Sequence, residues 1–245
     1  MEGVEWLHEK STNLEIIVDN ADKGGAILVY PPTLAEQKIL EKVTDENLYT
    51  CINKDPSDNI YDKLIDIWKN GKENKFVTEN EAFRTVGLTE NNQKSTASIY
   101  KPGDTYFNPS LKIHKMDIND IKPGCNPPSR LITCLQDGVT RRSDIFIAEK
   151  WLKPLQKDFC MDIVEDSMDV LVWLNELDKN TQDYKKTFKP FTFDFAALYD
   201  SLTPSLVVEA LKYAIQMCRS EWNTTFIDWL FELINLSMTS GFGKF

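Results

Sequence analysis

Asp194 lies near the end of the apolar run Phe191-Thr192-Phe193-Asp194-Phe195, where a carboxylate is least expected. Burying a carboxylate without a partner is costly, so Asp194 should meet water, a hydrogen-bond donor or a metal ion at the strand end. Enzymes of phosphoryl transfer hold two divalent ions with carboxylates, and Mg²⁺ prefers oxygen ligands. The spacing therefore admits a metal-binding aspartate. Spacing alone favours the plainer alternative, an aspartate that starts a turn or caps the helix that follows.

Three basic residues, Lys112, Lys115 and Arg130, lie on two short segments that read as strands, over 110–115 and 130–134. The loop between them is rich in proline and glycine, and proline fixes φ and lacks an N–H, so neither strand can continue through it. We expect a hairpin with a long tip. These cations could bind an anion, or they could be the solvated charges of an ordinary basic hairpin. His114 between them reads as a structural or surface histidine.

The segment Asp22-Lys23-Gly24-Gly25 separates two β-prone runs, 14–18 and 26–30. Successive glycines allow backbone amides to converge on an anion, because glycine adopts conformations closed to other residues. A plain tight turn explains the same residues and is the favoured interpretation.

Helices and strands alternate along the chain without a repeat, so the sequence predicts a mixed α+β fold. Apolar periodicity predicts helices from Thr33 to Val43, Ser57 to Lys69, Arg142 to Leu155, Ser167 to Leu177, Pro204 to Cys218 and Trp222 to Ile234. Thr203 should cap the fifth helix, and 90–98 reads as a polar linker. Side chains expected in the core are Met168, Leu171, Val172, Leu174, Trp151, Trp173, Trp222 and Trp229.

The composition limits the class of protein. The net charge is −10, which is the wrong sign overall for binding phosphates, although a local basic patch can override the total. The five cysteines lack the spacing of a zinc site or a disulfide framework, so we expect free thiols. No apolar run suits a membrane helix, and the acidic start is unlike a signal peptide. We expect an intracellular protein, in the nucleus or the cytoplasm, with the nucleus favoured.

The stretch Phe191-Thr192-Phe193-Asp194-Phe195-Ala196-Ala197-Leu198-Tyr199, followed by Ser201-Leu202-Thr203-Pro204, resembles motif A of reverse transcriptases, especially those of Penelope-like retroelements. The resemblance implies that Asp194 binds the catalytic Mg²⁺ ions and that Tyr199 selects deoxyribose. It also implies that the backbone amides of the residues between them face the triphosphate of the nucleotide. Those residues are Phe195, Ala196, Ala197 and Leu198.

Other blocks agree with that family in the same order. Asp22-Lys23-Gly24-Gly25 resembles its D-K-G signature, Leu111-Lys112-Ile113-His114-Lys115 resembles its P-K-I-H-K block, and Ser129-Arg130-Leu131-Ile132-Thr133 resembles its R-P-I-V-S strand. The segment 164–169 is similar to the one before the helix ahead of motif A. The resemblance implies that Lys112 and Arg130 contact the triphosphate. Leucine replaces proline at 111 and 131, so the sequence departs from the family's pattern at the two positions that bear on the turn geometry of this hairpin.

What the resemblance implies as a whole is part of an RNA-directed DNA polymerase with a right-hand fold. Residues 1–100 would form an N-terminal α/β extension, 101–160 the fingers, and 161–245 a partial palm. The partners would be an RNA template, a DNA primer and deoxynucleoside triphosphates, with Mg²⁺ as cofactor and no membrane. The sequence contains no Y-x-D-D motif, so this chain should not polymerise alone. The alternative is a non-catalytic retroelement remnant that acts as a nucleic-acid or protein-binding module.

Overall fold

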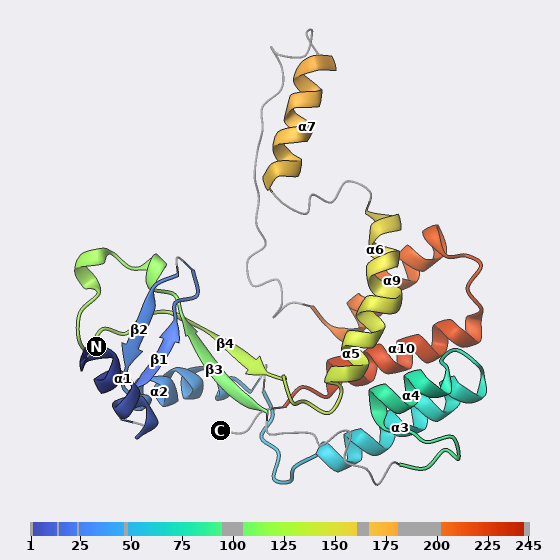
Figure 1. Cartoon of the computed structure of the whole chain (residues 1–245), viewed down its shortest axis with the longest axis horizontal. Coiled ribbons are helices and arrows are strands. Elements are labelled where there is room, and N and C mark those ends of the chain that lie inside the picture. The colour runs from blue at the N-terminus through green and yellow to red at the C-terminus, as the bar shows by residue number, and fades with distance from the viewer. Residues whose placement is uncertain are drawn as a thin grey trace. The chain divides into compact units, whose positions relative to one another are not determined.

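The computed structural model describes residues 2–13, 15–23, 25–46, 49–94, 105–160, 167–180 and 202–242. It contains helices and two small antiparallel sheets, which confirms a mixed α+β chain (Figure 1). The chain divides into two compact units, one of Met1–Arg142 with Leu236–Phe245 and the other of Ser143–Asn235. The expected boundaries near 100 and 160 remain a prediction. Within the described residues, no helix has the length and apolar character needed to cross a membrane.

The first hairpin of unit 1 joins β1 (Ile17–Asn20) to β2 (Ile27–Tyr30), with Ile17 opposite Tyr30 and Asn20 opposite Ile27. The predicted start of β1 near residue 14 was too early. The amide of Glu15 donates to the carbonyl of Lys10 at 3.0 Å, so the chain is still closing the preceding helix there. That helix, α1 (Glu2–Thr12), was not predicted, because its apolar residues give no buried stripe.

The second hairpin joins β3 (Tyr106–Leu111) to β4 (Ser129–Cys134), with Ser110 opposite Arg130 and Leu111 opposite Ser129. A hairpin with a long tip is confirmed, but the strand predicted over 110–115 ends at Leu111. The amide of Lys115 donates to the carbonyl of Lys112 at 3.0 Å, which closes the 3-10 turn η1 (Ile113–Lys115). A second turn, η2 (Ile118–Asp120), follows in the tip.

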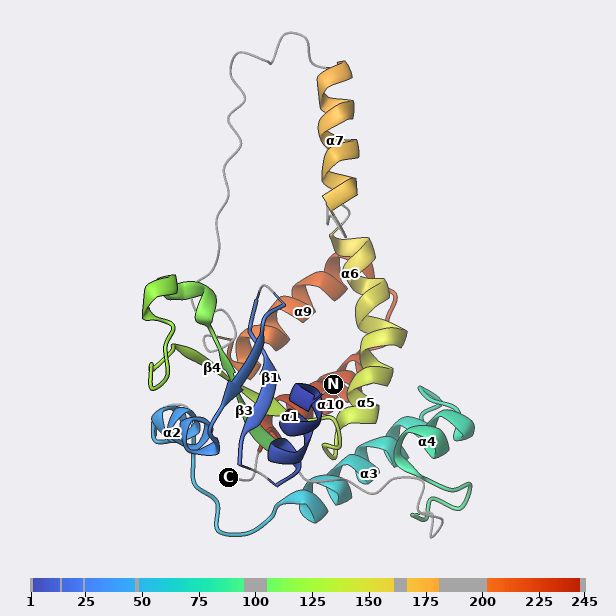
Figure 2. The ribbon, with the colours of Figure 1, turned by 60° about the vertical axis from the view of Figure 1, so that its left-hand side comes forward.

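Helix α2 (Pro32–Val43) begins on a proline at its first turn, as the sequence predicts to within one residue. It packs against β3 and β4, and the two hairpins lie beside one another in Figures 1 and 2. A small core forms where they meet. Its buried side chains are Tyr30, Ala35 and Leu111, and Ile17, Leu28 and Leu34 pack on it partly exposed.

Helix α3 (Ser57–Glu73) starts where predicted and runs four residues past Lys69. It pairs with α4 (Glu79–Val86), a short helix that the periodicity did not predict and that opens with a capping box of Thr78 and Glu81. The linker predicted over 90–98 is wrong where described. Lys72 donates to the carbonyls of Thr89 and Glu90, and a bridge from Leu88 to Lys94 closes a turn.

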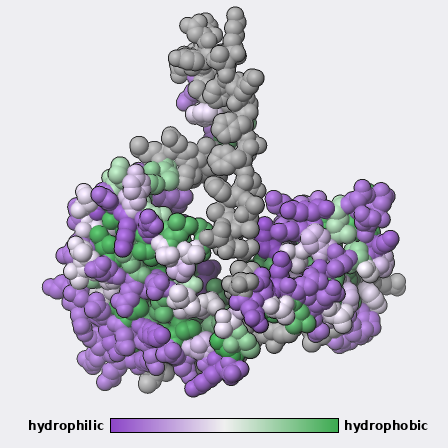
Figure 3. Space-filling view, turned by 180° about the vertical axis from the view of Figure 1, so that it is seen from behind, coloured by the Kyte–Doolittle hydropathy of each residue, from purple (hydrophilic) through white to green (hydrophobic). Residues whose placement is uncertain are grey.

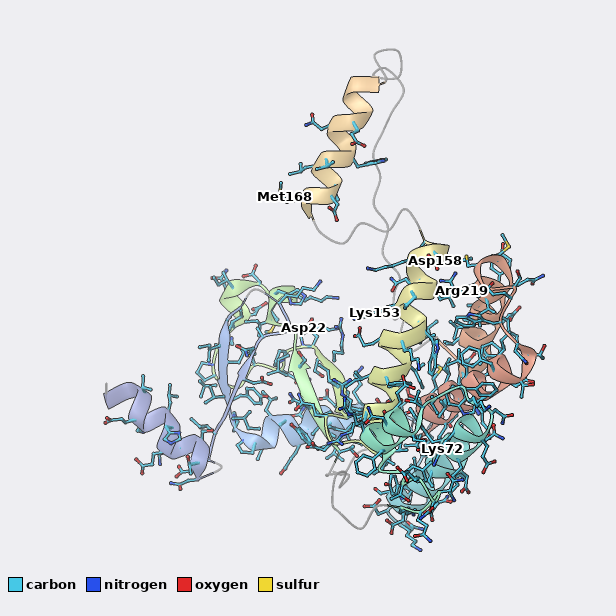
Figure 4. All side chains as sticks on the ribbon, turned by 45° about the vertical axis from the view of Figure 1, so that its right-hand side comes forward. Asp22, Lys72, Lys153, Asp158, Met168 and Arg219 are labelled. Atoms are coloured by element: carbon cyan, nitrogen blue, oxygen red, sulfur yellow. The ribbon has the colours of Figure 1, made fainter. Side chains whose placement is uncertain are left out.

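Unit 2 contains a continuous helical stretch made of α5 (Arg141–Ile147), the π-helical η3 (Ala148–Leu152) and α6 (Lys153–Phe159). Helix α9 (Pro204–Cys218) packs against α6, and the Thr203 hydroxyl accepts from the amide of Leu206, so the predicted cap is confirmed. Asp158 and Arg219 form an ion pair between them (Figure 4). The other described helices of this unit are α7 (Ser167–Asn180) and most of α10 (Thr224–Thr239), whose last residues belong to unit 1.

The tryptophans of unit 2 divide into buried and exposed sets. Trp151 and Trp229 are buried and their ring centroids are 5.4 Å apart, so their predicted core role is confirmed. Trp222 is half-buried and packs edge-on against Phe226 at 5.1 Å. Trp173 was predicted to be buried, but it is 50% exposed on α7 (Ser167–Asn180).

The inward face predicted for α7 is also wrong. Met168, Leu171 and Val172 are all more than half exposed, and Met168 extends away from the helix in Figure 4. Helical spacing identifies an apolar face, but it does not show that this face is buried. The side chain of Leu174 lies outside the described residues.

Hydrophobic side chains also interrupt the hydrophilic surface in Figure 3.

All five cysteines are free, as predicted.

Candidate anion-binding site

The turn after β1 lies against the end of β3. The amide of Asp22 donates to the carbonyl of Leu111 at 3.1 Å, and the amide of Ala21 closes its own turn onto Ala26 at 2.8 Å. Leu111 is only 3% exposed, so its side chain holds the end of β3 in the small core while its carbonyl faces the turn. This backbone contact joins two segments almost ninety residues apart and fixes the position of the Asp22 side chain (Figure 4).

Arg130 reaches the same place from β4. Its cross-strand partner is Ser110, so the two side chains project from the same face of the hairpin. The Nη1 atom of Arg130 lies 3.5 Å from Oδ1 of Asp22, and the Ser110 hydroxyl lies 3.5 Å from the same oxygen. The Arg130 side chain is 51% exposed, so part of its guanidinium remains open to solvent.

Lys112 follows β3 directly, and its amide donates to the carbonyl of Pro128 at 2.8 Å. Burial lowers the pKa of the Lys112 ammonium, and the positive charges of Arg130 and Lys115 lower this pKa further. Asp22 acts in the opposite direction on the same pKa. The lowered pKa means that partial burial, and then the neighbouring positive charges, disfavour the charged form of Lys112, a cost that an incoming anion would offset.

The Asp22 carboxylate is the counter-charge of this group. Its side chain is 8% exposed, which is rare for an aspartate. Oδ1 faces Arg130 and Ser110, whereas Oδ2 is buried with no hydrogen-bond partner among the described residues. We call Asp22, Lys112 and Arg130 the charge cluster. It joins a single buried anion to two cations that remain partly accessible, an arrangement suited to binding phosphate or carboxylate oxygens.

The other predicted site residues are distributed differently. Asp194, Tyr199 and the intervening Phe195, Ala196, Ala197 and Leu198 lie outside the described residues, so their predicted roles stay predictions. His114 and Lys115 are exposed on the η1 turn, as expected for surface residues. In the described part of the chain, no group of three or more His, Cys, Asp or Glu side chains could hold a metal ion.

Sequence reasoning missed the role of Asp22 and Ser110 in this cluster. The segment 22–25 was interpreted as a turn or an amide nest, and the contact of the Asp22 side chain with Arg130 was not foreseen. The sequence contains no local signal for this contact, because aspartate is common in turns, where its carboxylate is normally solvated. Glycine at position 25 has a φ of +66°, which explains why the turn needs a glycine there.

A cavity of about 1060 Å³ lies elsewhere in unit 1. Its lining includes Tyr49, Phe107, Thr133 and Phe242, and neither Lys112 nor Arg130 borders it. The Arg130 side chain is 51% exposed, so the charge cluster presents its guanidinium at the surface, where it suits the end of a charged ligand.

Comparison with known proteins found no family model, no curated protein and no solved structure that matches this chain.

Proposed function

We propose that this chain forms the fingers and the first part of the palm of an RNA-directed DNA polymerase. In this proposal Lys112 and Arg130 bind the triphosphate of an incoming deoxynucleotide. The observation that carries the proposal is the convergence of three blocks at one point. The D-K-G-G turn, the Leu111–Lys115 block and the Arg130 strand are far apart in sequence, yet they share the contacts of Asp22.

The chemistry of the cluster fits the proposal. A triphosphate presents several anionic oxygens. Proteins commonly bind such oxygens with the planar guanidinium of an arginine and the ammonium of a lysine. The pKa of Lys112 is lowered, and about half of the Arg130 side chain is exposed. Among the described residues, Asp22 is the anion that offsets the positive charge of this site. An acidic chain with this local cluster can bind a compact anion despite its total charge of −10.

The remaining roles rest on the resemblance alone. Asp194 would hold Mg²⁺ and Tyr199 would exclude a 2′-hydroxyl, with RNA template and DNA primer as partners. The described residues contain no metal-binding group, so we derive no step of the reaction through the ion. Because the sequence carries no Y-x-D-D motif, we expect this chain by itself to extend no primer.

Titration calorimetry of the full chain with dTTP tests the proposal. We expect dTTP to bind more tightly than thymidine, since the triphosphate supplies the contacts. Lys112→Gln and Arg130→Gln should each weaken dTTP binding about tenfold, the loss of one charge-assisted hydrogen bond. Lys69→Gln is the matched control, because Lys69 is a partly exposed lysine of α3 that pairs with Asp66, away from the charge cluster.

Equal binding of dTTP and thymidine would refute the triphosphate contact. Equal losses in Lys69→Gln and the two site variants would also refute it, since a general charge effect would then explain the binding. If dTTP does not bind but an RNA–DNA hybrid does, with affinity that falls as salt rises, the non-catalytic binding module is the better account.

A further inference from the structure

We infer that Asp22 is a positioning residue, which holds Arg130 in the orientation that receives an anion. This inference rests on the proposed function, because it assigns a role to a residue that supports the proposed triphosphate contacts. Asp22 itself need not touch the ligand. Its carboxylate would restrict the guanidinium of Arg130 before the anion arrives.

The geometry of Asp22 supports this role. Its backbone amide donates to the carbonyl of Leu111 at 3.1 Å, so the backbone that carries the carboxylate is anchored to the end of β3. Oδ1 then lies 3.5 Å from Nη1 of Arg130 and from the Ser110 hydroxyl. One backbone bond and two side-chain contacts therefore connect the turn to both strands of the second hairpin.

The unequal burial of the pair indicates which residue controls the other. The side chain of Asp22 is 8% exposed, and that of Arg130 is 51% exposed. An exposed arginine has many rotamers, and restricting them before binding reduces the entropy lost when a ligand arrives. The Asp22 carboxylate is buried and one of its oxygens has no hydrogen-bond partner among the described residues. The neighbouring cations are therefore the groups that can offset the free-energy cost of burying its charge.

Two effects of Asp22 on a bound anion have opposite signs, which makes the inference testable. Its negative charge repels an anion, so removing that charge should strengthen binding if charge alone matters. If Asp22 positions Arg130, removing the charge should weaken binding even though the site becomes more positive. Asp22→Asn separates the two effects, because asparagine keeps the backbone amide and nearly the same volume.

The experiment measures binding of inorganic tripolyphosphate to the full chain by calorimetry. We expect Asp22→Asn to weaken binding about fivefold, the cost of ordering a free arginine side chain. Asp19→Asn is the matched control. Asp19 lies on β1, with Oδ2 at 3.4 Å from the Asn108 amide, and its loss removes one charge near the same hairpin. We expect it to leave binding unchanged or slightly stronger.

A double-mutant cycle with Arg130→Gln identifies the route of the effect. In that background Asp22 has no arginine to position, so only its repulsion remains and Asp22→Asn should strengthen binding about twofold. A loss of the same size in both backgrounds would show that Asp22 does not act through Arg130. Stronger binding by the single variant Asp22→Asn would show that charge alone governs the site. Either result overturns the inference.

A second readout needs no anion. In the NMR titration of the lysine ¹³Cε signals, Asp22→Asn should lower the pKa of Lys112 below its wild-type value, because Asp22 raises it. An unchanged Lys112 pKa would overturn the placement of Asp22 among the cations. Asp22→Ser gives a second variant should the first fold poorly, with the same expected signs in both measurements.

The outcomes distinguish this inference from the proposed function. If tripolyphosphate does not bind the wild-type chain, the triphosphate site fails and the positioning role fails with it. If it binds, and Lys112→Gln and Arg130→Gln weaken it while Asp22→Asn does not, the site stands and only the role of Asp22 is refuted.

Discussion

Leu111→Ala tests whether the small core between the hairpins holds the charge cluster in place. Leu111 is 3% exposed and packs with Tyr30 and Ala35, and its carbonyl accepts the Asp22 amide. The substitution removes three carbon atoms from that core, worth about 2.4 kcal/mol at roughly 0.8 kcal/mol each. The cavity left behind adds to this loss. Its neighbours Ile17 and Leu28 are only partly buried and can relax into the space, so the addition is small.

We therefore expect Leu111→Ala to lower the free energy of unfolding by about 3 kcal/mol, in the lower half of the range for buried leucines. For a unit of this size that corresponds to a fall in Tm of about 6–12 °C. Urea unfolding followed by circular dichroism measures the first quantity and a thermal scan the second. Amide hydrogen exchange at Asp22 and Lys112 should accelerate together, because their acceptors belong to Leu111 and Pro128.

Ile118→Ala is the matched control, since Ile118 lies in the tip of the same hairpin and is 81% exposed. Its substitution should change stability by no more than about 0.5 kcal/mol. Tripolyphosphate binding should weaken in Leu111→Ala and remain unchanged in Ile118→Ala. Equal losses of stability in the two variants would refute the claim that this core holds the hairpin against the turn.

Three further predictions concern single residues. Thr78→Ala should cost about 1 kcal/mol in urea unfolding, because it removes the capping box that Thr78 forms with Glu81 at the start of α4. Tyr30→Phe should not destabilise at pH 8, since the buried hydroxyl has no partner among the described residues. Burial raises the pKa of Tyr30 to about 12. The free energy of unfolding of the wild type should therefore decrease between pH 10 and 12, and that of Tyr30→Phe should not show this decrease. Lys112→Gln should stabilise the chain at pH 7, because the lowered pKa of Lys112 marks an ammonium disfavoured by the fold. The wild type should recover that difference as the pH rises toward 10.5, which urea unfolding at several pH values would show.

The parts of the fold that follow local rules were predictable from the sequence. Helix α9 begins at Pro204 behind the Thr203 cap, and α2 begins at Pro32, because these residues act within one turn of the helix. The second hairpin was predictable from the prolines of its tip. Its first strand was placed too late, because Lys112–Lys115 alternate like a strand yet close a 3-10 turn.

Contacts between distant segments were not predictable in the same way. The apolar spacing on α7 indicated a buried face, but spacing does not supply a partner, and Met168 and Trp173 are exposed. The Asp22 turn could be recognised, but its docking on Leu111 depends on the register of both hairpins and on the packing of α2 against β3 and β4. The resemblance implied that Lys112 and Arg130 bind the same ligand, but the contact of Arg130 with Asp22 could be found only in the fold.

The sign of the total charge and the sign of the charge cluster lead to different expectations for different ligands. At physiological salt the Debye length is about 8 Å, so acidic side chains farther away have little effect on an anion held by Lys112 and Arg130. A long duplex extends well beyond that distance and meets the acidic remainder of a chain whose net charge is −10. The charge cluster therefore suits a compact, highly charged ligand, whereas binding of a duplex by the same chain would need a second basic surface away from this cluster.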